Sequence, residues 1–137
     1  SKKVSREDVE ELTGAPKTTL VNEYIKAIAE KSVEQGINAV KQAEDSAMDM
    51  RLFFKLIIEK FRVAIILRYA PKLEKSMASD LGEEDLEFLK KLVKADIEGM
   101  LRSKGLAILL EEYQNLDNAF IPALPLELAL IRIIGEK

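Results

Sequence analysis

The sequence predicts an all-α protein, a single bundle of about seven helices. Leu, Ala, Glu, Lys and Ile dominate the 137 residues, and only six Gly and four Pro interrupt them. Apolar residues recur at intervals of three and four along most of the chain, which is the spacing of one helix face. The alternation of apolar and polar residues that indicates a half-buried strand is nearly absent. A chain of this length can bury a real core in one domain.

The composition excludes several function classes. The formal net charge is −3, whereas a domain dedicated to nucleic acid usually carries a basic excess. The chain has no Cys and no His, which removes disulfides, Cys-ligated zinc and the commonest general base. No signal peptide is visible, and the apolar stretch 52–70 contains five charged side chains and is no membrane span. We therefore expect a cytoplasmic protein. Its start, Ser-Lys-Lys without Met, leads us to expect a piece of a longer one.

The first third of the chain is expected to form three helices. Residues 5–14 begin with a good N-cap residue and end at a glycine, and Pro16 then breaks the chain. Residues 19–30 and 33–47 each carry apolar side chains at helical spacing. Gly36 lies inside the third helix, where it costs about 1 kcal/mol relative to Ala.

A long central helix is expected over residues 49–70. Its charged side chains fall largely on one narrow stripe, and nearly every other position is apolar. A helix of this kind is contacted by neighbours around most of its circumference. Pro71 ends it, because the residue before a proline disfavours helical backbone. The polar residues 71–82 that follow are expected to be mobile.

Two further helices precede the last one. Residues 83–94 are amphipathic, with acidic residues first and lysines last, as the helix dipole favours. Asp96 is expected to be the N-cap of a helix that runs to about residue 118. Within it, Gly105 would allow a neighbouring helix to approach closely. The final helix follows Pro122.

The final helix is apolar on nearly every face. Between residues 124 and 134 only Glu127 and Arg132 are charged. Such a helix must be buried in a core, a membrane or a partner. This one is too short for a bilayer, which needs about 20 residues. We therefore expect protein on all sides of it.

Three features that could carry chemistry have simpler interpretations. Residues 14–19 share Gly and Lys-Thr with a phosphate-binding loop but lack its first glycine and its preceding strand. Adjacent carboxylates on a helix point about 100° apart and do not converge on a metal ion. Lys90, Lys91 and Lys94 could touch phosphates, but the acidic balance favours a solvated helix end. We predict no catalytic, cofactor-binding or metal-binding residue.

Three segments, in order along the chain, resemble one known family. VSREDVEELTGAP at residues 4–16 resembles the end of an AAA+ lid domain. FFKLIIEKFRVAIILRYAP at 53–71, and LLEEYQNL and LPLELALIRI near the end, resemble domain III of the bacterial DNA polymerase III gamma/tau subunit. The resemblance implies that residues 1–15 are the remnant of the lid domain. Residues 16–137 would then form the helical collar that holds the subunits of a clamp loader together.

This resemblance implies a structural role in DNA replication. The partners would be other clamp-loader subunits, namely gamma/tau, delta and delta-prime, and the isolated chain could form homo-oligomers. No residue of this chain would do chemistry. ATP and Mg²⁺ would bind in the AAA+ domains of the parent protein. Neither direct nucleic-acid binding nor membrane binding is expected.

Two groups of residues are the candidate sites. The first is a subunit interface formed by Phe120, Leu124, Leu126, Leu130 and Ile134, with Tyr113 at its rim. The alternative is that the last helix simply completes the monomer's own core. The second is a buried ion pair between Arg62 and Glu127, because an unpaired buried carboxylate is costly. Its alternative is that Arg62 pairs with Glu59 on the exposed stripe.

Two other functions remain open on the sequence alone. One is the collar of a delta-prime-like or archaeal-type small clamp-loader subunit, which the attached AAA+ domain would distinguish. The other is an unrelated helical adaptor or regulator that dimerises through its last helix and does not bind clamp-loader subunits.

Overall fold

The structure, a computed structural model, describes residues 17–135, and every element in this range is helical. The helix and lid remnant expected before residue 17 lie outside this range. Seven α-helices, two 3₁₀ turns and a final π turn follow in order: α2 (Lys17–Ala29), α3 (Val33–Asp45), α4 (Met50–Tyr69), η1 (Pro71–Leu73), α5 (Glu74–Leu81), α6 (Glu83–Ala95), α7 (Ser103–Gln114), η2 (Leu116–Asn118), α8 (Leu124–Leu130) and η3 (Ile131–Gly135). The predicted all-α bundle is confirmed. Across residues 17–135, no helix combines the length and apolar character needed to cross a bilayer.

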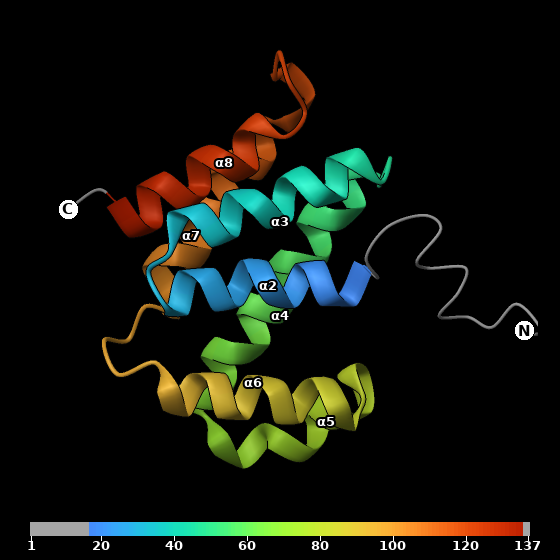
Figure 1. Ribbon diagram of the computed structural model, residues 1–137. Helices are drawn as coiled ribbons and strands as arrows, with labels where there is room; N and C mark the ends of the chain where they lie inside the picture. The colour runs from blue at the N-terminus through green and yellow to red at the C-terminus, as the bar shows by residue number, and fades with distance from the viewer. Residues whose placement is uncertain (1–16, 136–137) are drawn as a thin grey trace, which may run out of the picture.

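The central helix is α4, as predicted. It packs against α2, α3, α6 and α7, and Phe53, Phe54, Ile57 and Phe61 along it are fully buried. Its start is set by the Asp49 carboxylate, which accepts hydrogen bonds from the backbone amides of the next turn. In Figure 1, α4 runs behind α2 and joins the two ends of the molecule.

The two ends of the molecule are built from different helices. At one end α8 packs on α3 and α7, and at the other α5 packs on α6 (Figure 1). The loop before α8 projects beyond the neighbouring helices (Figure 1). The molecule therefore presents two unlike ends.

Two glycines permit close helix contacts. A Cβ atom on Gly105 in α7 would lie 2.7 Å from Cζ of Phe61 on α4, and one on Gly36 in α3 would lie 2.6 Å from the methyl carbons of Leu130. Both neighbouring side chains are fully buried. The close approach expected at Gly105 is confirmed. Gly36 lowers helix propensity, but its missing side chain leaves room for Leu130 at the end of α8.

Residues 71–81, within the segment expected to be mobile, form helical turns. Pro71 begins the 3₁₀ turn η1, where its fixed φ suits helical backbone, and α5 follows directly. Met77 is buried against the core, and the Glu74 carboxylate pairs with Lys90 of α6 at 2.8 Å. Its polar composition reflects a helix that buries one face only.

Asp96 does not cap a following helix, because α7 begins at Ser103. Its carboxylate is buried and accepts the backbone amides of Met100 and Leu101 at 2.8 and 2.7 Å. The same carboxylate pairs with Arg68 of α4 at 2.6 Å, and Arg68 also donates to the Leu101 carbonyl at 3.2 Å. Asp96 therefore organises the connection between α6 and α7.

Candidate functional site

Apolar side chains gather on the exposed side of the C-terminal helix and the loop before it. The exposed fraction is 93% for Phe120, 44% for Ile121, and 40% for both Leu128 and Ile131, while Leu124 is half-buried. Leu124, Leu128 and Ile131 recur at the spacing of one helix face. We call these five residues the apolar ridge.

The predicted interface residues divide between this ridge and the core. Phe120 and Leu124 lie on the ridge, and Tyr113 and Ile134 are half-buried. Leu126 and Leu130 have no exposed surface and belong to the domain's own core, which corrects the expectation that they form a surface contact. These residues are buried because they face the helices on which α8 packs. Leu130 packs on Gly36 of α3, and the Leu126 carbonyl accepts a hydrogen bond from the buried Tyr24 hydroxyl at 2.7 Å.

Ile121, Leu128 and Ile131 were missed by sequence reasoning. The available signal was the spacing of Leu128 and Ile131 from Leu124, which defines one stripe of the final helix. That stripe could not be told from its neighbours, because nearly every face of this helix is apolar.

Tyr113 supports the base of the projecting loop. Its ring meets the Phe54 ring edge to face, with centroids 5.3 Å apart and an interplanar angle of 79°. The Arg51 guanidinium lies 5.7 Å from the centre of the Tyr113 ring, donates to its hydroxyl at 3.4 Å and pairs with Asp117. These contacts connect the start of α4 to η2, from which the loop departs.

The expected Arg62–Glu127 ion pair is not formed: the ion pairs of residues 17–135 include neither residue, nor a pair of Arg62 with Glu59. Burial, and then the nearby Glu44 carboxylate on α3, raise the pKa of Glu127. Glu127 is only half-buried, so it does not need a cation as a fully buried carboxylate would.

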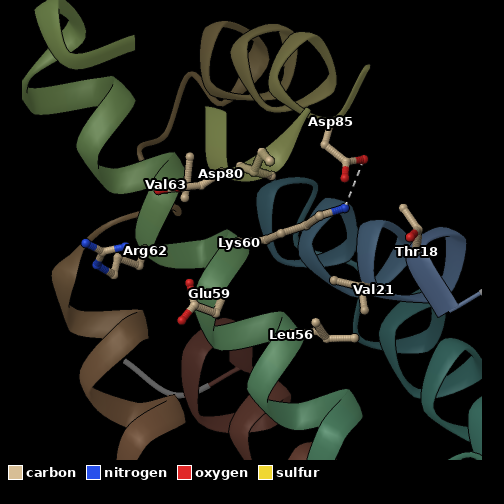
Figure 2. Close-up of a pocket in the computed structure, with 10 residues that line it drawn as sticks. Thr18, Val21, Leu56, Glu59, Lys60, Arg62, Val63, Asp80 and Asp85 are labelled. Atoms are coloured by element: carbon tan, nitrogen blue, oxygen red, sulfur yellow. Dashed lines mark ion pairs between the residues drawn. The ribbon is translucent and has the colours of Figure 1, made fainter. Parts of the chain in front are cut away.

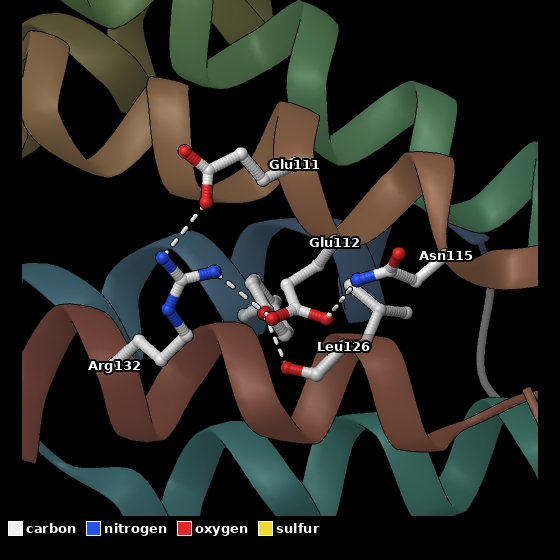
Figure 3. A network of polar contacts seen from close by, with 6 residues as sticks. Glu111, Glu112, Asn115, Leu126 and Arg132 are labelled. Atoms are coloured by element: carbon white, nitrogen blue, oxygen red, sulfur yellow. Dashed lines mark hydrogen bonds and ion pairs between the residues drawn. The ribbon is translucent and has the colours of Figure 1, made fainter.

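The second charge of the final helix, Arg132, connects α8 and η3 to α7. Arg132 donates to Glu112 at 2.9 Å and to Glu111 at 2.8 Å, and Figure 3 shows its guanidinium between the two carboxylates. Glu112 is 5% exposed and also accepts from the Asn115 amide at 3.4 Å. This network, together with the Tyr24–Leu126 hydrogen bond, holds the inner face of the last helix and leaves the ridge outward.

The network lies within the segments that suggested a family: Glu112 falls in LLEEYQNL, and Leu126 and Arg132 fall in LPLELALIRI. Residues 4–137 match the family model described as DNA polymerase III subunits gamma and tau, domain III. The chain belongs to this family. The family predicted from the three segments is thereby confirmed. No curated protein and no solved structure matched the sequence.

This gamma/tau domain III also contains a pocket of about 270 Å³ between α2, α4, the end of α5 and the start of α6. Figure 2 shows Lys60 of α4 reaching across it to Asp85, at 3.2 Å, and Lys60 also donates to the Asn22 side chain at 2.6 Å. Burial lowers the pKa of Lys60, although Asp85 opposes the effect. Both charges are already paired, and no cluster of three acidic residues in the described range could hold a metal ion. We therefore interpret the Lys60–Asp85 pair in this pocket as a structural contact between α4 and α6.

The buried Tyr24 gives this domain III a distinct alkaline response. Burial, and then the Glu112 charge, hold the pKa of Tyr24 well above 10.0 in the folded state. As pH rises past 10.0 the unfolded chain loses this proton first, so stability should fall by up to about 1.4 kcal/mol per pH unit. In urea titrations, Tyr24→Phe should be less stable at neutral pH but lose less stability above pH 10.0. Equal slopes of unfolding free energy against pH above 10.0 for the native chain and Tyr24→Phe would contradict this.

Proposed function

We propose that this domain III assembles clamp-loader subunits through the apolar ridge. The observation that carries the proposal is the outward stripe of Leu124, Leu128 and Ile131 continued by Phe120 and Ile121. Apolar side chains on a scaffolded, outward face are typical of protein interfaces, where aromatic residues are enriched. Family membership supports the same role, since the family is a domain of clamp-loader subunits.

The partners we propose are gamma/tau, delta and delta-prime subunits in the bacterial cytoplasm. The chemistry of the parent protein, ATP hydrolysis with Mg²⁺, would belong to its AAA+ domains. In this scheme the ridge keeps the subunits together and leaves catalysis to other domains. Neither nucleic acid nor membrane is a proposed ligand of this surface.

The test is light scattering on a sizing column, from micromolar to near-millimolar concentration, with the chain alone and mixed with a delta-prime subunit. The double variant Leu128→Asp/Ile131→Asp should weaken association by at least about tenfold, because charges replace apolar side chains at the contact. Both residues are 40% exposed, so the variant should keep its fold, which circular dichroism checks.

The matched control is Ile97→Asp, since Ile97 is 93% exposed but lies in the loop between α6 and α7. It should associate as the unaltered chain does. Association that ignores the ridge variant would reject the ridge as the interface. Self-association through the ridge without binding to delta-prime would favour a dimeric helical adaptor.

A further inference from the structure

A groove with a basic rim lies at the end of the molecule opposite the ridge. It has a volume of about 410 Å³ and is lined by α6, the last turns of α4 and the start of η1 and α5. Leu67, Pro71 and Val93 supply its apolar lining. Lys90, Lys91 and Lys94 form its rim on α6. We call this surface the lysine-rimmed groove.

The positive charge of the rim is only partly neutralised. Lys90 pairs with Glu74 at 2.8 Å and with Glu87 at 3.5 Å. Lys91 and Lys94 are exposed and take part in none of the ion pairs of residues 17–135. Like charges three and four residues apart on a helix repel one another. The groove lining carries three lysines and two carboxylates, Glu74 and Glu87, and so keeps one excess positive charge. An apolar group that brings a carboxylate would cover the accessible parts of Pro71 and Val93 and balance this charge.

The ridge has that complementary character. Phe120 is 93% exposed on the loop before α8, which projects from the molecule (Figure 1), so the rest of residues 17–135 leaves its ring almost uncovered. Glu127 lies on the same helix as the ridge, and Glu44 approaches it from α3. Neither carboxylate takes part in an ion pair within the described range. The ridge thus presents an exposed aromatic side chain, Phe120, and is accompanied by two carboxylates, Glu44 and Glu127, that form no ion pair within residues 17–135.

We propose that the ridge of one copy, led by Phe120, docks into the lysine-rimmed groove of a second copy. This inference rests on the proposed function and gives it a geometry. The two surfaces lie at opposite ends of the molecule, so the contact is head-to-tail, the arrangement that builds rings or open chains. A ridge-to-ridge contact would instead bring the Glu44 and Glu127 carboxylates of two copies together, and like charges oppose such pairing.

Cysteine cross-linking tests the geometry directly, because the chain has no native Cys. Asn118→Cys places a thiol beside Phe120, and Glu87→Cys places one at the groove while leaving the rim lysines intact. Mixed under mild oxidation, the two proteins should form a mixed disulfide about tenfold faster than either forms its own dimer. Gln42→Cys, on the exposed side of α3, is the control partner for Glu87→Cys and should cross-link slowly.

Charge reversal gives an independent readout. Lys91→Glu/Lys94→Glu should weaken self-association at least about tenfold while leaving helix content unchanged, since both residues are exposed. If the ridge variant weakens association but this reversal does not, the ridge remains an interface and head-to-tail docking is wrong. Dominant Asn118→Cys homodimers, or no mixed disulfide at near-millimolar concentration, would also overturn it. A third outcome would also overturn the proposal. If Lys91→Glu/Lys94→Glu left self-association unchanged but abolished binding of a single-stranded oligonucleotide, the groove would be a phosphate site.

Discussion

Replacing Asp96 by Ala is expected to lower the free energy of unfolding by about 3 kcal/mol. The carboxylate side chain has no exposed surface, and its loss leaves the amides of Met100 and Leu101 without an acceptor. It also leaves Arg68, whose side chain is 22% exposed, without its partner. Urea denaturation followed by circular dichroism would measure the change.

The control for this prediction lies two residues away. Glu98 also pairs with a cation, Lys31 at 3.0 Å, but its side chain is 64% exposed. Glu98→Ala should therefore change stability by less than about 0.5 kcal/mol. Similar small effects for both variants would mean that the connection between α6 and α7 does not depend on Asp96.

The effect of Gly105→Ala on the free energy of unfolding is expected to depend on the side chain at position 61. In the native chain the added methyl group meets the Phe61 ring, and the overpacking, about 1–3 kcal/mol, should exceed the gain of about 1 kcal/mol in helix propensity. In a Phe61→Leu background the atom it meets is gone, so the same substitution should be neutral or stabilising. A double-mutant cycle by urea denaturation should give a coupling energy above about 1 kcal/mol.

Gly36→Ala supplies the matched control for the cycle. It is also overpacked, but against Leu130 rather than Phe61. Its cost should therefore add to that of Phe61→Leu within about 0.5 kcal/mol. Additivity at both glycines would show that the Phe61 ring does not limit the approach of α7 to α4.

Local signals were sufficient for most of the helices. The central helix, expected over 49–70, is observed as Met50–Tyr69 with Asp49 as its cap, because a capping residue, a continuous apolar pattern and a following proline all agree there. The helix expected over 83–94 is observed as Glu83–Ala95 for similar reasons. Each boundary depends on residues close in sequence.

Long-range contacts explain what the sequence did not reveal. Asp96 has the chemistry of an N-cap, but Arg68, distant in sequence, turns it into the centre of a loop. The rotation of the last helix is likewise set by Gly36 and Tyr24, which lie far from it along the chain. For a helix that is apolar almost all round, periodicity alone cannot decide which leucines face inward.

The buried contact between Tyr24 and the Leu126 carbonyl has a mechanical consequence. It ties α2, the first described helix, to α8, which carries the ridge, without an intervening flexible link. A substitution that repositions Tyr24 in α2 is therefore expected to disturb the position of α8 as well, since close-packed interiors are stiff and transmit strain. The orientation of the ridge thus depends on a residue about one hundred positions earlier in the chain.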